Sequence, residues 1–365
     1  LVEKGIIHQE CGRIFRVKKD QQDAGQPLRL HRHQVDAIEA AQAGDNYVLT
    51  TGTGSGKSLA YIVPIVDYVL RQGSGKGIKA IVIYPMNALA NSQYGELEKF
   101  LRFGYPDGRG PVTFDKYTGQ ESEEQKKQII DNPPDILLTN YVMLELILTR
   151  VREKSLISAA KNLKYLVLDE LHTYRGRQGA DVAMLVRRLR NYCGDQSLQC
   201  VGTSATLAGG GTYQQQRAEV AQVATLLFGA PVKPDRVVME TLQRTTPDKD
   251  LTDPDFKREL TDTLQKGQKS FDNYQDFIAD PLSIWIETTF GITAEAGSGR
   301  LVRSTPRSIS GEHGAARELS QLTGLPEERC VKAIQERLLT GYTCKHPQTG
   351  FPIFAFRLHQ FISRG

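Results

Sequence analysis

The chain has 365 residues, enough for about two domains, and its 39% hydrophobic and 24% charged residues suit a globular protein. The five cysteines form no CxxC pair, which argues against a disulfide framework or a zinc site and for a cytoplasmic location. The longest apolar run, residues 59–70, is short and carries Asp67, which argues against a membrane-spanning helix. The net charge of +4 permits an anionic partner such as nucleic acid, but an ordinary basic surface explains it equally well.

Up to about residue 240, short β-rich runs alternate with helical patterns. We predict strands at 46–50, 79–85, 111–119, 135–140, 165–170, 199–206 and 235–242, and helices at 58–70, 89–103, 121–131, 180–192 and 217–229. Runs that are apolar throughout indicate a sheet buried on both faces, and strand–helix alternation indicates parallel strands with right-handed crossovers. This half is therefore predicted to be an α/β domain with a doubly wound parallel sheet.

The second half has a different texture. Residues 245–270 are polar and rich in Pro and Asp, which is typical of a linker joined to helices. We predict an amphipathic helix at 278–292 with Trp285 inward, a loop at 297–311, and two helices within 312–341 separated by a turn at 324–326. A hairpin-like pair around 346–361 would complete a winged-helix pattern. Residues 244–365 are thus expected to be mainly helical with a winged-helix-like end.

The sequence TGTGSGKS, Thr51 to Ser58, stands between a predicted strand and a predicted helix. Backbone amides can approach a polyphosphate only where glycine lets the chain curl, and the following helix directs its positive end at the phosphates. Lys57 can reach the β- and γ-phosphates, and the Ser58 hydroxyl can bind Mg²⁺. The predicted nucleotide-binding residues are Thr51, Gly52, Thr53, Gly54, Ser55, Gly56, Lys57 and Ser58. A glycine-rich structural turn is the alternative.

An acidic pair ends the apolar run at 165–168. Asp169 can hold Mg²⁺, and Glu170 can orient the water that attacks the γ-phosphate. The carboxyl ends of parallel strands gather at one edge, so both residues are expected near the phosphate loop. The alternative is an acidic pair that only caps a helix N-terminus.

Taken together, these motifs resemble the superfamily 2 helicases of the DEAD/DEAH-box type. Residues 28–38 resemble the adenine-reading Q motif with Gln34 as base reader, and 51–58 and 169–172 resemble motifs I and II. Residues 84–93, 117–119 and 137–144 resemble the motifs that contact nucleic acid, and 203–206 resembles motif III. The resemblance covers about 28–242. It implies ATP and Mg²⁺ as cofactors and nucleic acid as partner.

The resemblance assigns roles residue by residue. Lys57, Asp169, Glu170 and His172 are implied as catalytic, with Ser58 and Asp169 on Mg²⁺, and Ser204 and Thr206 as links that couple the sites. The implied nucleic-acid contacts are Pro85, Asn87, Thr118, Gly119, Thr139, Asn140 and, beside motif II, Arg175. Each has an ordinary alternative: a turn residue, a strand-end hydroxyl cap, a polar residue at a helix start or, for Arg175, a solvated side chain.

A narrower resemblance is to the bacterial mitomycin-repair helicases and the related helicases of Druantia and DISARM anti-phage systems. It implies an N-terminal extension at 1–27, a first RecA-like motor domain at 28–243, and an inserted segment at 244–365. Motifs IV to VI are not found, so the second RecA-like domain is expected elsewhere in a longer protein, and this piece is expected to bind nucleotide but hydrolyse it slowly.

The implied function is an ATP-driven helicase or translocase, with DNA favoured over RNA, in DNA repair or anti-phage defence. The implied partners are nucleic acid, the rest of its own chain and a defence-system subunit or nuclease. An ATP-gated scaffold that clamps nucleic acid without unwinding it, or an RNA helicase, stays open as an alternative.

Overall fold

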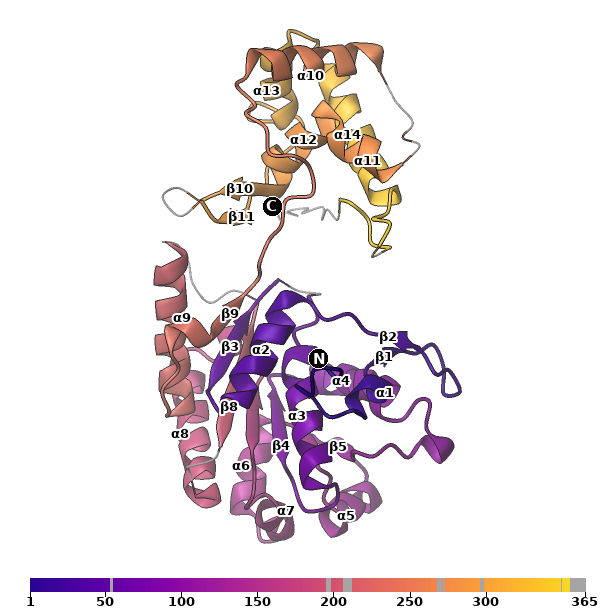
Figure 1. The fold of residues 1–365 in the computed structure, drawn as a ribbon. Coiled ribbons are helices and arrows are strands. Elements are labelled where there is room, and N and C mark those ends of the chain that lie inside the picture. Colours follow the sequence, from indigo (N-terminus) through magenta and orange to yellow (C-terminus); the bar gives the residue numbers. More distant parts are fainter. Residues whose placement is uncertain are drawn as a thin grey trace. The chain divides into compact units, whose positions relative to one another are not determined.

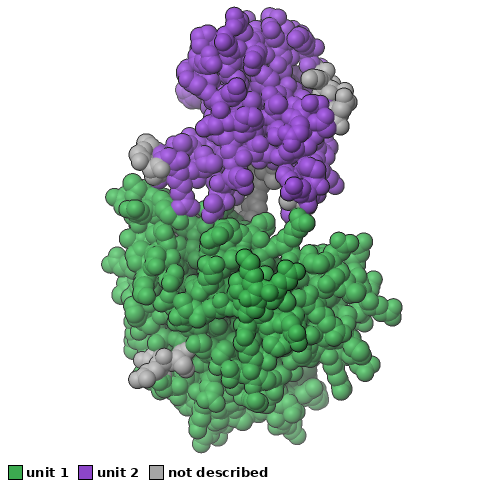
Figure 2. Space-filling model, in the orientation of Figure 1, with its two compact units in different colours: residues 1–240 green, residues 241–365 purple. Residues whose placement is uncertain are grey.

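The computed structural model describes residues 1–52, 55–194, 198–205, 212–267, 271, 273–295, 299–348 and 350–354. These residues form two compact units, 1–240 and 241–365, which are coloured separately in Figure 2. Within the described residues, no helix has the length and apolar character needed to cross a membrane.

Unit 1 is built on a seven-stranded sheet in which every neighbouring pair is parallel (Figure 1). In chain order its strands are β3 (Tyr47–Thr50), β4 (Ala80–Tyr84), β5 (Phe114–Tyr117), β6 (Ile136–Asn140), β7 (Tyr165–Leu168), β8 (Gln199–Ser204) and β9 (Val237–Met239), and their order across the sheet is β5-β6-β4-β7-β8-β3-β9. All seven predicted strands are present, each shorter than or equal to its predicted range. The α/β fold class with a parallel sheet is confirmed.

Helices cover both faces of this sheet. The helices are α2 (Arg32–Gln42), α3 (Leu59–Gln72), α4 (Asn87–Leu101), α5 (Glu123–Asp131), α6 (Tyr141–Thr149), α7 (Lys154–Ala159), α8 (Gly176–Cys193) and α9 (Tyr213–Phe228). Alternate strand residues point to opposite faces: Leu49 and Val82 pack with α2, α3 and α4, whereas Val48 and Ile81 pack with α6 to α9. The sheet is therefore doubly wound, as the sequence predicts. Helices α2, α6 and α7 were not predicted.

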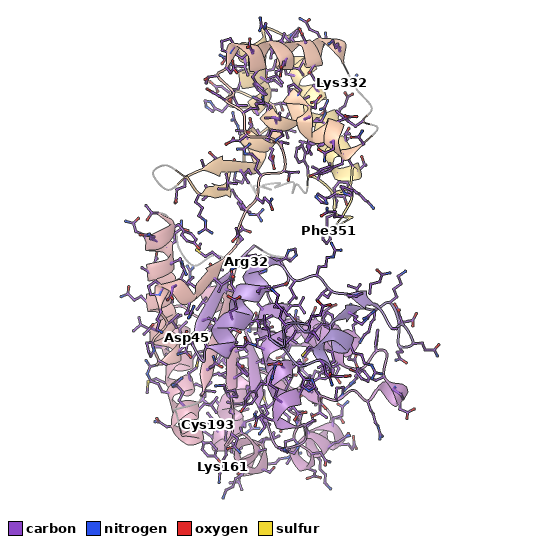
Figure 3. All side chains as sticks on the ribbon, in the orientation of Figure 1. Arg32, Asp45, Lys161, Cys193, Lys332 and Phe351 are labelled. Carbon is purple, nitrogen blue, oxygen red and sulfur yellow. The ribbon has the colours of Figure 1, made fainter. Side chains whose placement is uncertain are left out.

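The edge of the sheet at β9 is fixed by an acidic residue. Asp45, labelled in Figure 3, precedes β3 and accepts hydrogen bonds from Arg236 Nε at 2.6 Å and Lys233 Nζ at 3.3 Å. The Arg236 guanidinium lowers the pKa of the Asp45 carboxyl. These bonds tie the chain before β9 to the start of β3.

The N-terminal segment packs onto unit 1. It contains α1 (Cys11–Ile14) and a small hairpin of β1 (Arg16–Val17) and β2 (Gln26–Pro27). Ile14 is fully buried in the core beside α3, and Lys18 Nζ donates to the carbonyls of Phe100 and Phe103 at the end of α4. The predicted N-terminal extension at 1–27 thus contributes residues to the core of this unit.

Unit 2 is mainly helical. Its elements are α10 (Pro254–Lys266), α11 (Tyr274–Ala279), α12 (Pro281–Ile286), a π-helical turn (Glu287–Gly291), a hairpin of β10 (Ile292–Ala294) and β11 (Leu301–Arg303), α13 (Ala315–Thr323) and α14 (Glu327–Thr343). Trp285 is fully buried, and the two predicted helices around the 324–326 turn are confirmed as α13 and α14.

Two local predictions for unit 2 were wrong. The helix expected at 278–292 is broken at Asp280, because Pro281 cannot continue α11 and Asp280 instead caps α12 through its bonds to the Leu282 and Ser283 amides. The loop expected at 297–311 contains β11. After α14, Lys345 pairs with Pro352, but most of the second predicted wing strand lies outside the described residues, so the winged helix stays a prediction.

Candidate functional site

The predicted site residues follow the carboxyl ends of neighbouring parallel strands. The phosphate loop follows β3, Pro85 and Asn87 follow β4, Thr118 and Gly119 follow β5, Asp169 follows β7, and Ser204 ends β8. Parallel strands bring all of these positions to one edge of the sheet, where α/β proteins bind their ligands. Thr53, Gly54 and Thr206 lie outside the described residues.

The described part of the phosphate loop turns sharply at Gly56, where φ is +71°. A side chain there would be strained, and its Cβ would lie 2.7 Å from Gln34 Nε2, so this position requires glycine. Thr51 is buried, and its hydroxyl lies 2.6 Å from the Ser55 hydroxyl. Helix α3 begins directly after Ser58, so the N-terminus of this helix is directed toward the loop.

Gln34 braces this loop from α2. The buried Gln34 amide donates from Nε2 to the Gly56 carbonyl at 2.8 Å, and its Oε1 accepts from the His31 amide at 2.8 Å. His33 Nε2 lies 3.0 Å from the Ser55 carbonyl oxygen. Both polar groups of the Gln34 side chain are thus hydrogen-bonded within the protein. Its role as adenine reader stays a prediction, and it requires at least one of these hydrogen bonds to be replaced by one to the base.

Lys57 and Glu170 bring the two predicted motifs together. Lys57 Nζ lies 3.6 Å from Glu170 Oε1, and the lysine side chain is 11% exposed. The ammonium is buried without a hydrogen-bond partner among the described residues. Glu170 adopts a left-handed backbone conformation with φ 53° and ψ 56°, which is uncommon for a residue with a side chain and often marks a functional position. A buried cation without hydrogen bonds fits a site that receives phosphate oxygens.

Asp169 is held by Thr203, a residue that the sequence analysis did not single out. The Thr203 hydroxyl donates to Asp169 Oδ1 and accepts from the Glu170 amide at 3.2 Å. In the register of β7 and β8, Leu168 lies opposite Gly202, so Thr203 stands beside Asp169. The sequence carries a signal for this contact, a hydroxyl at the end of a strand, but it does not say that β7 and β8 are neighbours.

Burial raises the pKa of Asp169 to about 6, and the nearby Glu170 charge adds to this effect. The Thr203 hydrogen bond and the Lys57 charge lower the pKa but do not offset burial. A carboxylate that has lost water and is only partly compensated favours a bound cation. Oxygen ligands from Asp169 and Ser58 are the type that Mg²⁺ prefers, so the residues fit this metal.

His172 connects the acidic pair to β8. It lies in a 3₁₀ turn, Leu171–Thr173, and its Nδ1 is 3.2 Å from both the Ser204 hydroxyl and Glu170 Oε2. Gly202 makes room for this turn, because a Cβ there would lie 2.3 Å from Leu171 Cδ1. His172 and Ser204 are therefore in contact, and their role as a link between these motifs stays a prediction.

Asn140 joins three strand-end loops. Its Nδ2 donates to Asn87 Oδ1 at 2.7 Å and to the Thr118 carbonyl at 3.1 Å, and its Oδ1 accepts from the Met143 amide at the start of α6. The loops after β4 and β5 and the junction of β6 with α6, which we call the three joined loops, consequently form one hydrogen-bonded unit. This brings together Asn87, Thr118 and Asn140, three of the predicted nucleic-acid contacts.

The sequence profile of the DEAD/DEAH box helicase family matches residues 31–231, more than half of the chain. The chain belongs to this family. The family match begins just before Gln34 and ends beyond β8, so it includes every part of the site described above.

Individual relatives of this DEAD/DEAH box chain are distant. It is 34% identical over 184 residues to the uncharacterized ATP-dependent helicase YprA of Bacillus subtilis (strain 168), covering 49% of this chain and 23% of YprA. It is 26% identical over 291 residues to the Druantia protein DruE of Escherichia coli (strain UMEA 4076-1), covering 49% of this chain and 16% of DruE. A crystal structure of the DUF1998 helicase MrfA bound to DNA has 28% identity and a TM-score of 0.46, covering 58% of this chain and 27% of MrfA.

The chain thus spans less than a third of each of these three proteins. The resemblance to Druantia-type helicases that the sequence indicated is confirmed by the match to DruE. Within this DEAD/DEAH box chain, the remaining predicted residues differ in exposure: Arg175 is exposed just before α8, Pro85 is half-buried, and Thr118 and Thr139 are buried.

Proposed function

We propose that this chain is the nucleotide-binding part of an ATP-dependent helicase or translocase that acts on nucleic acid. The observation that carries the proposal is the approach of Lys57 to Glu170, with the lysine ammonium buried and lacking a hydrogen bond. This arrangement offers a positive charge to an anion and sets two carboxyl groups beside it, which phosphoryl transfer from ATP to water requires.

The residues divide the work of ATP hydrolysis between them. Lys57 and the amides of the phosphate loop hold the triphosphate, and Ser58 and Asp169 hold Mg²⁺, which neutralises charge on the phosphate oxygens when bound. Glu170 orients the attacking water and accepts its proton. Glu170 Oε1 is paired with Lys57 Nζ in the structure. Phosphate oxygens compete for the lysine and release Glu170 toward the water.

The His172–Ser204 contact connects the proposed site of ATP hydrolysis to strand β8. Glu170 Oε2 and the Ser204 hydroxyl lie at the same 3.2 Å distance from His172 Nδ1. Glu170 Oε2 makes no hydrogen bond within the described residues, so a change in its position changes the charge beside His172, which contacts the end of β8. We assign these two side chains to the coupling of nucleotide state to movement on nucleic acid.

The proposed substrate is a nucleic-acid strand held at the loops joined by Asn140. Contacts to the sugar–phosphate backbone carry no base information, so movement is expected to be independent of sequence. The narrower sequence resemblance favours DNA, a cytoplasmic role in anti-phage defence or DNA repair, and cooperation with a second RecA-like domain and a defence-system or nuclease partner.

The test is ATP turnover by the complete protein with and without single-stranded DNA or RNA. We expect stimulation by DNA and strand separation on a tailed duplex, with Lys57→Ala abolishing both. Lys99→Ala, at an exposed lysine of α4 paired with Glu96, serves as the matched control. If Lys57→Ala keeps its turnover, the site assignment is wrong. Stimulated turnover without strand separation would favour the clamp-like scaffold, and stimulation by RNA alone would favour an RNA helicase.

A further inference from the structure

We propose that the nucleic-acid path continues beyond the three joined loops to the edge strand β5, along Asn91, Gln120 and Lys116, with Lys116 contacting a backbone phosphate. The inference rests on the proposed function, because it extends the same contact surface. Asn91 lies within the stretch 84–93 that resembles a nucleic-acid motif, but none of the three residues was named as a contact in the sequence analysis, and Gln120 and Lys116 lie outside the matched stretches.

The first reason is that two predicted contact residues face inward. Thr118 and Thr139 are 3% and 0% exposed. The Thr118 hydroxyl donates to Glu121 Oε1 at 2.7 Å, and the Thr139 hydroxyl donates to the Tyr117 carbonyl at 2.7 Å. These hydroxyls hold the loops together and are not available to a phosphate without breaking bonds within the protein.

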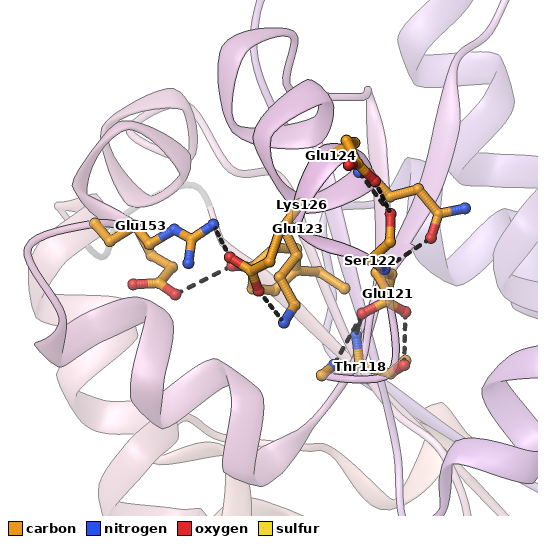
Figure 4. Close-up of polar contacts among 11 residues, drawn as sticks. Thr118, Glu121, Ser122, Glu123, Glu124, Lys126 and Glu153 are labelled. Carbon is orange, nitrogen blue, oxygen red and sulfur yellow. Dashed lines mark hydrogen bonds and ion pairs between the residues drawn. The ribbon is translucent and has the colours of Figure 1, made fainter.

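Glu121 explains how the loop after β5 is arranged. Its buried carboxylate also accepts from the Thr118 and Gly119 amides, both at 2.9 Å, so Thr118 and Glu121 are held face to face (Figure 4). Gly119, with φ +90°, lets the chain turn tightly enough for this contact. Gln120 lies between Gly119 and Glu121 and is exposed, so its side-chain amide is accessible from solvent.

A short ladder of hydrogen-bonded side chains connects the Gln120 amide to the Lys116 ammonium through Asn91. Asn91 Nδ2 donates to Gln120 Oε1 at 3.4 Å, and Lys116 Nζ donates to Asn91 Oδ1 at 2.6 Å. Asn91 is exposed and Lys116 half-buried, with its ammonium 5.5 Å from the centre of the Tyr94 ring. The contact with Asn91 uses one of three ammonium donors, which leaves donors for a phosphate oxygen.

This ladder is continuous with the loops already assigned to nucleic acid. Asn87 and Asn91 are four residues apart on α4 and so lie on the same face of the helix. Asn87 accepts from Asn140. A line of amides therefore runs from Asn140 through Asn87 and Asn91 and ends at Lys116, a charged residue on the edge strand. Amide and ammonium groups are suited to a phosphodiester backbone and read no bases.

The experiment measures binding of the complete protein to a fluorescent oligo-dT strand by anisotropy, between about 50 and 200 mM salt. Loss of one phosphate contact from a single strand reduces the slope of log K against log salt by about 0.7. We expect Lys116→Ala to weaken binding several-fold and to reduce the slope by this amount. Lys116→Arg, which keeps the charge, should retain the slope, and Lys99→Ala, at the other end of α4, should match wild type.

The outcomes separate the two proposals. If wild type binds oligo-dT and Lys116→Ala leaves its slope unchanged, the path does not reach β5, while the proposed function stands. If wild type does not bind oligo-dT or oligo-rU, the proposed function and this inference both fail. A titration with ATP gives the internal control: Lys116→Ala should bind nucleotide like wild type, because Lys116 lies on the edge strand β5 whereas the phosphate loop follows β3. Weaker nucleotide binding would indicate general disruption and overturn the assignment.

Discussion

Replacing Asp169 by asparagine should stabilise unit 1 in the absence of metal at neutral pH. Burial raises the pKa of this carboxyl from 3.8 to about 6. Each pKa unit corresponds to about 1.36 kcal/mol, so the ionised carboxylate costs at most about 3 kcal/mol. Because the residue is not completely shielded from solvent, we expect about 1–3 kcal/mol. Asparagine removes the charge and keeps an oxygen that can accept the Thr203 hydrogen bond.

The sign of the pH dependence follows from the direction of the shift. The folded-state pKa is above the unfolded value, so the stability associated with the protonated form is fully present below about pH 4 and is lost as pH rises through about 6. The difference in unfolding free energy between Asp169→Asn and wild type should therefore grow between these pH values, in favour of the variant.

Urea unfolding with EDTA at several pH values measures this difference. Asp181→Asn, at an exposed acid on α8, controls for a general effect of charge. A difference that does not change with pH, or an Asp169→Asn protein less stable than wild type at pH 7, would refute the desolvation argument. The same substitution should greatly weaken Mg²⁺-dependent ATP binding, because it removes a carboxylate that is proposed to bind the metal. The variant would therefore be more stable than wild type but less able to bind Mg·ATP.

Three further substitutions test separate contacts. Gln34→Ala removes the donor to the Gly56 carbonyl, and a nucleotide titration should show affinity about tenfold weaker, consistent with about 1–3 kcal/mol for a lost buried partner. Gly202→Ala sets a Cβ against Leu171 and should lower unfolding free energy by about 1–3 kcal/mol in a denaturation series. Asn140→Ala separates three loops and should weaken oligo-dT binding in anisotropy measurements without changing ATP affinity.

Much of the sheet could be predicted because inner strands such as β4 and β7 are buried on both faces and are therefore apolar throughout. Helix α6 was missed because it starts directly after β6, with no glycine or proline to separate the two apolar runs. Helix α2 lies within the stretch that was interpreted through its motif, and its helical spacing was not considered. Strands β10 and β11 have three residues each, too few to show alternation.

The site residues could be predicted by type and position but not by orientation. Sequence order indicates that Thr118 follows β5, yet it does not indicate that its hydroxyl donates to Glu121 rather than to solvent. The sequence also does not reveal the order of the strands in the sheet, and Thr203 contacts Asp169 only because β8 is the neighbour of β7. Gln34 shows the same limits: the sequence does not show that α2 lies beside the phosphate loop, or that the Gln34 amide donates to the Gly56 carbonyl.

The most direct test of the account is calorimetric titration of Mg·ATP into this chain and into its Lys57→Ala variant. Loss of a charge-assisted contact of about 1.5–3 kcal/mol predicts binding by Lys57→Ala about ten- to a hundredfold weaker than by wild type. Equal affinities for the two proteins, or no binding by wild type, would contradict the claim that Lys57 and the loop around Gly56 hold the triphosphate.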